Sequence, residues 1–442
     1  MTKRFAIAAL IPAFLAGFSG PPSIEPVTAP MADEVSVDWQ NLLKQSAFFV
    51  AIQHGFRLAT ERETRVNTGG PFLRGWAESV KSVHGWSDGD PFIVNYVGHP
   101  MQGATSGYVW VQNDRAFRRY GFSRDPRYWK SRLRAAAFAA IYSEQFELGP
   151  FSEATVGKVQ RDYPQRGFVD HVVTPSIGLG WMIAEDAVDR YVIEAVERRV
   201  QSPYARILLR AGLNPSRSMA NLLAGRVPWY RDYRPGALVR NNGVDRSLLP
   251  PYAEPEPPPG VAPFEIAITG HPETFPHRVR CAGGAVQPAF RLSRSWQLVA
   301  DVGGCKLLDP PGNTSGDSVH YRVGPRWSPR PDGLLRPHVQ FLVGGAKISI
   351  DQSGPEKERL LESIKKGEHT TKALRDAVIR AEAANGLSIA AGAGVDLDIS
   401  RSLALRLLSL EYRRNWAPPI AGVEYTHGLR FSSGLLLKIG TW

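Results

Sequence analysis

Beyond residue 264 the chain alternates between apolar and polar side chains in one segment after another. In the last of these segments, residues 429–442 (LRFSSGLLLKIGTW), Leu435 and Leu437 share one face and Leu436 lies on the other. Successive side chains of an extended strand point to opposite sides, so each segment predicts a strand with one apolar face. The other segments are residues 264–270, 278–292, 296–307, 318–327, 338–348, 387–399 and 403–412. Eight strands of about ten residues are the smallest set that closes a transmembrane β-barrel.

The connections between these segments alternate in length. Residues 293–295, 328–335 and 400–402 are short links, whereas residues 308–317, 349–384 and 413–428 are longer ones. Outer-membrane barrels have short turns on the periplasmic rim and long loops on the outer rim. A soluble β-sandwich has no reason to sort its loops in this way. The connections therefore predict a barrel whose first strand starts, and whose last strand ends, on the periplasmic side.

Residues 264–442 resemble the small OmpA-like outer-membrane β-barrel proteins. The resemblance rests on the segments GGAVQPAF, GGAKI, AAGAGVDLDIS, LALRLLSLEYRR and FSSGLLLKIG. Proteins of this class end their last strand on an aromatic residue that the barrel-assembly machinery reads. The resemblance therefore implies two partners, which are outer-membrane lipid and, through Trp442, that machinery.

The N-terminus has the order of a secretory signal. Lys3 and Arg4 precede an apolar run over residues 5–18, and small residues and prolines follow. We therefore expect residues 1–32 to be a signal peptide with its flank; the alternative is an uncleaved membrane anchor. Beyond this run no uncharged stretch approaches the roughly 20 apolar residues of a spanning helix. Export would place both cysteines in an oxidising compartment.

Residues 33–248 have helical rather than alternating periodicity. Residues 35–60, 132–148 and 176–200 predict helices, while residues 90–107 predict a short apolar run leading into a His-Pro turn. Residues 249–263 (LPPYAEPEPPPGVAP) are too rich in proline for a helix or a central strand, so they predict an extended linker. The expected fold is thus α+β and multidomain: a mainly helical domain, a linker, and an antiparallel eight-stranded transmembrane barrel over residues 264–442.

The helical half loosely resembles a family of uncharacterised bacterial envelope proteins. The matching segments are NYVGHPMQG, SEQFELGPFSE and DHVVTPSIGLGWMIAEDAVDR. That family has no assigned activity, so the resemblance implies no mechanism, cofactor or site residue.

Histidines and carboxylates gather in the same helical segments. The weak candidates for a catalytic or metal site are His99, Glu144, Glu147, Asp170 and His171. The two glutamates are three residues apart and would share a helix face, from which they could ligate a divalent metal with a histidine or supply an acid–base pair for lipid chemistry. The alternative is that these groups cap helices and pair with arginines in a packed bundle. Since no metal, nucleophile or phosphate-loop motif is present, we expect no catalysis, no metal and no cofactor.

The polar face of the predicted strands would line the barrel lumen. Its members are Asp301, His320, Arg322, Arg326, Gln340, Asp396, Arg406, Glu411, Arg430 and Lys438. A barrel of eight strands leaves room for little more than side chains, so a plug of mutually neutralising charges is favoured over a narrow pore. Two irregularities are expected: a bulge at Pro288, and another between Leu407 and Leu408, where the alternation slips.

The two cysteines predict a disulfide. If the tight turn centres near Ser293, Cys281 and Cys305 lie directly opposite each other on the inward face of an antiparallel pair. Residues opposite each other have Cα atoms about 4.5–5.5 Å apart, which a disulfide accepts. The alternative, if the turn shifts by one residue, is a pair of free buried thiols.

The net charge of +11 is basic, but zinc-finger spacing, an RNA-binding signature and a Lys/Arg block are all missing. Anionic lipid therefore fits the charge better than nucleic acid. The expected function is an outer-membrane barrel that anchors a periplasmic helical domain, with a structural or envelope-maintenance role and no catalysis. The alternatives are a lipid-modifying envelope enzyme working from the helical half, a narrow pore, and a soluble periplasmic β-domain.

Overall fold

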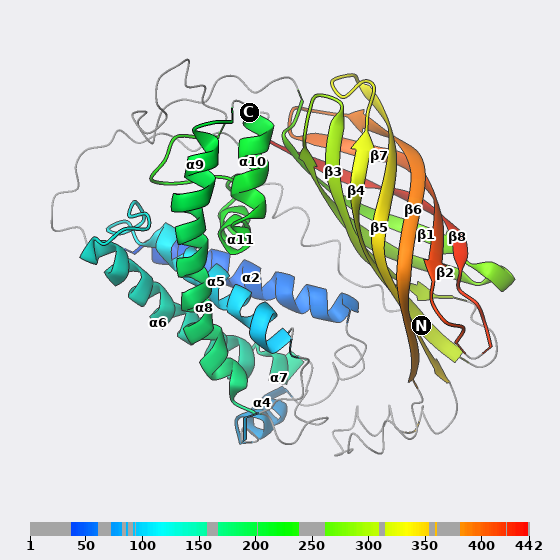
Figure 1. Ribbon diagram of the computed structural model, residues 1–442. Coiled ribbons are helices and arrows are strands. Elements are labelled where there is room, and N and C mark those ends of the chain that lie inside the picture. The colour runs from blue at the N-terminus through cyan, green and yellow to red at the C-terminus, as the bar shows by residue number, and fades with distance from the viewer. Residues whose placement is uncertain are drawn as a thin grey trace.

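The computed structural model describes residues 37–60, 72–81, 85–86, 92, 94–156, 167–200, 202–237, 261–308, 314–352, 359, 381–420 and 422–440. The predicted signal segment, most of the proline-rich linker and the C-terminal Trp442 lie outside the described residues. The described residues form a helical half and a β-barrel that lie beside each other (Figure 1).

The helical half is an assembly of short and medium helices. Their bounds are α2 (Trp39–Thr60), α4 (Phe72–Lys81), η2 (Val94–Gly98), α5 (His99–Asn113), α6 (Pro126–Leu148), α7 (Glu153–Val156), α8 (Val169–Val188), η4 (Asp189–Ile193), α9 (Glu194–Glu197), α10 (Pro203–Gly212) and α11 (Pro215–Leu223). The first two predicted helices are present as α2 and α6, and the range predicted for the third is covered by α8, η4 and α9; α6 and α8 start earlier than expected. The turn expected at the His-Pro pair is wrong: α5 begins there, because Pro100 occupies the first turn, where no N–H is needed.

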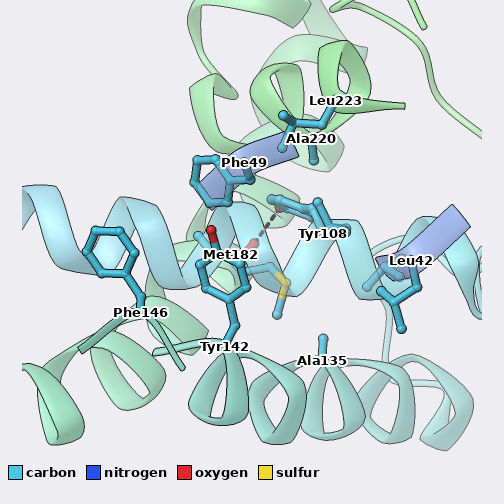
Figure 2. Packing of buried hydrophobic residues seen from close by; sticks show 12 residues of the cluster. Leu42, Phe49, Tyr108, Ala135, Tyr142, Phe146, Met182, Ala220 and Leu223 are labelled. Carbon is cyan, nitrogen blue, oxygen red and sulfur yellow. Dashed lines mark hydrogen bonds between the residues drawn. The ribbon is translucent and has the colours of Figure 1, made fainter. Parts of the chain in front are cut away.

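Helix α5 is the centre of this half, in contact with α6, α8 and α11. Around it lie the buried apolar side chains in Figure 2, among which Tyr108 donates a hydrogen bond to the Met182 carbonyl oxygen at 2.9 Å. Helices α5 and α8 touch through their backbones. A Cβ at Gly103 would lie 2.0 Å from the Thr174 carbonyl oxygen, so only glycine fits. This close contact fixes how the two helices align.

The second half is a closed antiparallel barrel in which each strand pairs with its neighbour in sequence and β1 pairs with β8. The strands are β1 (Phe264–Thr274), β2 (Arg280–Arg291), β3 (Trp296–Leu307), β4 (Thr314–Trp327), β5 (Leu335–Gln352), β6 (Ala381–Asp398), β7 (Leu403–Trp416) and β8 (His427–Ile439). The predicted fold class is confirmed. Several strands run further towards the long loops than the alternation predicted, because ladder hydrogen bonds continue where the apolar outer face ends.

One of the two expected irregularities is present. The register between β7 and its neighbours shifts around Leu407 and Leu408, so that prediction is confirmed. The bulge expected at Pro288 is wrong, since β2 pairs with β3 at Val286–Val302 and again at Ala289–Val299 in one register. Pro288 has no N–H to donate, so the strand loses one ladder hydrogen bond there but keeps its register.

The structure contains the disulfide Cys281–Cys305, with Cα atoms 5.6 Å apart. The register predicted for this hairpin is wrong, however. Cys281 pairs with Leu307, and Cys305 pairs with Gly283, so the cysteines are diagonal neighbours rather than direct partners. A shift of this kind keeps both side chains on the inward face, because that face recurs at every second residue.

Replacing both cysteines by serine is expected to lower the unfolding free energy of the barrel by about 1–3 kcal/mol, because the loop that the bond closes is already held by strand pairing. Denaturant unfolding in detergent measures this loss. Thiol titration of the unfolded, unreduced wild-type chain is the control and should find no free thiol. Two free thiols, or equal stability of the two proteins, would contradict the expectation.

Candidate functional site

The lumen of the barrel is filled by polar side chains. All ten residues predicted to point inward are buried, and none is more than 6 % exposed. At the centre, the Asp301 carboxylate accepts a hydrogen bond from Arg430 at 2.7 Å and lies 3.3 Å from His320. Arg430 also donates to Glu411 at 2.7 Å, so one guanidinium joins two carboxylates. The central layer is thus a closed group of charges that compensate one another.

A second group of charges lies nearer the short-turn rim. Glu265 accepts from Arg336 at 2.6 Å and from Gln297 at 2.8 Å. Arg336 also lies 2.8 Å from Asp398, whose other oxygen accepts from Lys438 at 2.6 Å. Cations and carboxylates therefore alternate through this layer as well.

Several buried lumen residues were absent from the predicted set, and four charged ones among them are Glu265, Glu273, Arg336 and Arg413. Glu265 stands between two outward apolar residues, so the alternation already marked it as inward. The other three lie beyond the ends that the sequence suggested for their strands, and Glu273 and Arg413 form an ion pair there. Continuing the inward positions by two or three residues would have found them.

The outer face of the barrel is apolar and exposed. Its large exposed side chains include Val286, Val302, Val323, Phe341, Leu410 and Phe431. Trp296 pairs with Trp327 at the short-turn end. Among the described residues, charged side chains on the outer face occur near the rims, such as Lys306 and Lys347 towards the long loops and Arg294 in a short turn. An apolar band between charged rims is typical of a transmembrane barrel.

The two halves meet at the short-turn rim. Ile207 of α10 and Trp229 pack with Phe264, at the start of β1, and with Ile439, at the end of β8. The rings of Trp229 and Phe264 lie 6.3 Å apart, edge to face. The helical half therefore contacts the rim of the barrel where β1 begins and β8 ends.

Most buried carboxylates of the helical half are neutralised by arginine. Asp186 accepts from Arg132 at 2.6 Å, and Glu197 accepts from Arg210 at 2.5 Å. Asp189 lies between Arg231 and Arg234. Burial alone would raise the pKa of Asp189, but these two guanidinium groups outweigh it and hold the pKa well below its usual range. This is the packed-bundle arrangement that the sequence offered as the alternative to a site.

The five candidate site residues separate into two groups. His171 and Glu144 form a pair at 2.7 Å in which the glutamate is half exposed. His99, Glu147 and Asp170 come together inside the bundle, with one ligand-type atom of each within 4.8 Å of the others. His99 Nε2 lies 3.5 Å from Asp170 Oδ1. The glutamates that share a helix face in sequence thus belong to different environments.

Among the described residues, no helix is long and apolar enough to cross a bilayer.

No family model matches the chain, and no curated protein matches it. Among solved structures, Neisserial surface protein A is similar at 12% identity and a TM-score of 0.28, covering 41% of this chain and 98% of its own. The attachment invasion locus protein Ail of Yersinia pestis has 10% identity and a TM-score of 0.26, covering 40% and 96%. The N-terminal β-barrel domain of Pseudomonas aeruginosa OprF has 13% identity and a TM-score of 0.23, covering 39% and 96%.

The barrel half itself has the features that define small outer-membrane barrels: eight antiparallel strands in sequence order, full closure, an apolar exterior and a charged, filled interior. The resemblance to OmpA-like barrels expected from the sequence is therefore confirmed for residues 264–440.

Proposed function

We propose that this chain is an outer-membrane protein whose barrel anchors a helical domain on the periplasmic side, in a structural or envelope-maintenance role without catalysis. The observation that carries the proposal is the exterior of the closed barrel. Exposed large apolar side chains on every strand would be unfavourable in water, and a continuous apolar band of this kind marks a membrane surface.

The periplasmic position of the helical half is supported by its contacts. It packs against the short-turn rim through Trp229 and Phe264. In barrels of this architecture the short turns face the periplasm. A barrel inserted in that sense places the helical half on the periplasmic side.

The lumen supports anchoring over conduction. A water-filled channel would leave its lining side chains accessible, whereas Asp301, His320 and Arg430 are at most 1 % exposed. Their charges are also directed at one another. We therefore expect no ion conduction when the protein is reconstituted into a planar bilayer.

Two measurements on the full chain test the proposal. Unheated protein from the outer-membrane fraction should migrate differently on a gel from boiled protein, because a folded barrel resists the detergent. Protease added to intact cells should leave the helical half uncut, and permeabilising the outer membrane should expose it. Identical migration before and after boiling would rule out the barrel anchor. Cutting of the helical half in intact cells would rule out its periplasmic position.

Phe341→Arg is expected to make the free energy of barrel insertion less favourable by about 2–4 kcal/mol, which is the cost of an arginine on the lipid face near the midplane. Phe341 is 46 % exposed and lies in β5 midway between Leu335 at the short-turn rim and the outward-facing Lys347. The folded fraction in purified membranes, read from gel migration, measures the effect.

Leu334→Arg is the matched control, because Leu334 is 69 % exposed just before β5, at the short-turn rim. The same substitution there should cost about 0–1 kcal/mol, as expected near the interface. Equal folded fractions for the two variants would mean that this face does not meet lipid.

A further inference from the structure

We propose that His99, Glu147 and Asp170 form a binding site for one divalent transition-metal ion of the Zn²⁺ class. The three residues come from α5, α6 and α8, and they are 7 %, 4 % and 5 % exposed. Their ligand-type atoms all lie within 4.8 Å of one another. The proposal concerns the helical half alone and does not depend on the function proposed for the barrel.

The packing of the helices assembles this group. Gly103 of α5 meets Thr174 of α8 backbone to backbone. His99 and Asp170 stand one helical turn before these two positions, so the parallel contact carries their side chains towards each other. Glu147 arrives from the last turn of α6, which packs against both helices. Three helix ends therefore direct an imidazole and two carboxylates at one point.

The spacing suits a shared ion better than a direct hydrogen bond. His99 Nε2 and Asp170 Oδ1 are 3.5 Å apart, which is longer than the roughly 2.7–3.2 Å of an N–H···O hydrogen bond. Two ligands that each lie about 2.1 Å from a tetrahedral Zn²⁺ would be about 3.4 Å apart. The two side chains already have the separation that common coordination would give them.

Buried polar atoms on the helix faces that carry the three ligands supply a second observation. Among the described residues, His99 Nδ1, Ser143 Oγ, Thr174 Oγ1 and Gln102 Nε2 are buried without a hydrogen-bond partner. Ser143 precedes Glu147 by one helical turn, Thr174 follows Asp170 by one turn, and Gln102 follows His99 by three residues, so all three lie on the helix faces that carry the ligands. Water bound to an ion held by His99 Nε2, Glu147 and Asp170 would offer hydrogen bonds to polar groups on these three helix faces.

The donor set selects the class of metal. Imidazole nitrogen favours Zn²⁺ and its neighbours over Ca²⁺ or Mg²⁺, which prefer oxygen ligands alone. Three protein ligands leave a fourth position for water or another group. Among the described residues, a second cluster with a possible donor set consists of His271, Glu273 and Cys305. It does not qualify, because the Cys305 sulfur is held in the disulfide. This proposal reverses our expectation from the sequence that the chain holds no metal.

The test uses the full-length chain in detergent, without a polyhistidine tag and stripped by a chelator. On addition of Zn²⁺ we expect one ion per chain after gel filtration, and a rise in the midpoint of thermal unfolding of the helices measured by circular dichroism. His99→Ala and Asp170→Asn should each weaken Zn²⁺ binding on the order of 10–100-fold and abolish the rise.

His171→Ala and Glu144→Gln are the matched controls, because this pair stands beside the site in sequence but belongs to the exposed pair in the structure. Both should keep one Zn²⁺ per chain. Failure of the wild-type chain to bind Zn²⁺ would overturn the proposal even if the site variants did not fold. Loss of binding in the control variants, with retention in Asp170→Asn, would overturn it equally.

Discussion

Arg430→Met is expected to lower the unfolding free energy of the barrel by about 3–5 kcal/mol, the cost of removing one partner from a buried ion pair. Arg430 is 1 % exposed and donates to both Asp301 and Glu411. Methionine keeps an unbranched stem but is shorter and has no charge. The two carboxylates would then remain inside the barrel without the cation that joins them, and burial of such charges is strongly unfavourable.

Urea unfolding of the barrel in detergent or lipid vesicles, followed by gel migration, measures this loss. Arg294→Met is the control, because Arg294 forms an ion pair with Asp332 at 2.6 Å on the exposed rim. Water screens the charges of an exposed pair, so the control should unfold close to the wild type. If Arg430→Met also unfolds like the wild type, the charges of the lumen do not stabilise the barrel.

Asp189→Asn is expected to lower the unfolding free energy of the helical half by a comparable amount, about 3–5 kcal/mol. Asp189 accepts from Arg234 at 2.6 Å, from Arg231 at 3.1 Å and from the Tyr233 hydroxyl at 2.5 Å. Asparagine keeps the shape but removes the charge. Two guanidinium groups would then stay buried without their shared carboxylate.

The same contacts predict that the stability of the helical half depends on pH. The pKa of Asp189 is lower in the folded state than in the unfolded state because Arg231 and Arg234 outweigh its burial. A carboxyl of this kind contributes stability above its unfolded pKa of about 3.9, and that stability is lost as the pH falls through the folded pKa. The wild-type helices should therefore lose stability below about pH 4, and Asp189→Asn should lose less.

Urea titrations of the full chain at several pH values, followed by circular dichroism of the helices, measure both the loss of unfolding free energy and its dependence on pH. Glu194→Gln is the control, since Glu194 pairs with Arg190 and Arg198, whose side chains are exposed. It should change the stability by less than about 1 kcal/mol. A variant at Asp189 as stable as this control would show that the buried pairs do not hold η4 against the rest of the bundle.

Within the predicted strands, local alternation is enough to say which side of the barrel wall a residue occupies. Inward and outward positions recur at every second residue, so Asp301, Arg430 and Phe341 are placed by local alternation alone. The same alternation located the slip at Leu407, because a bulge moves the pattern by one position. The order of short and long connections likewise showed which rim holds both ends of the barrel.

The alignment of one segment with another depends on contacts that local alternation does not contain. Cys305 pairs with Gly283 rather than with Cys281, because the register of a hairpin depends on the geometry of its turn and on both neighbouring strands. The strand ends were also set by pairing, which is why Arg336 and Arg413 were missed.

The grouping of His99, Glu147 and Asp170 was decided in the same way. All three were candidates in the sequence, but Glu144 and His171 were equally good ones by type and spacing. The contact between Gly103 and Thr174 selects which of them face one another. Helical periodicity states which residues share a face of one helix, whereas the meeting of faces from three helices depends on packing between segments far apart in the chain.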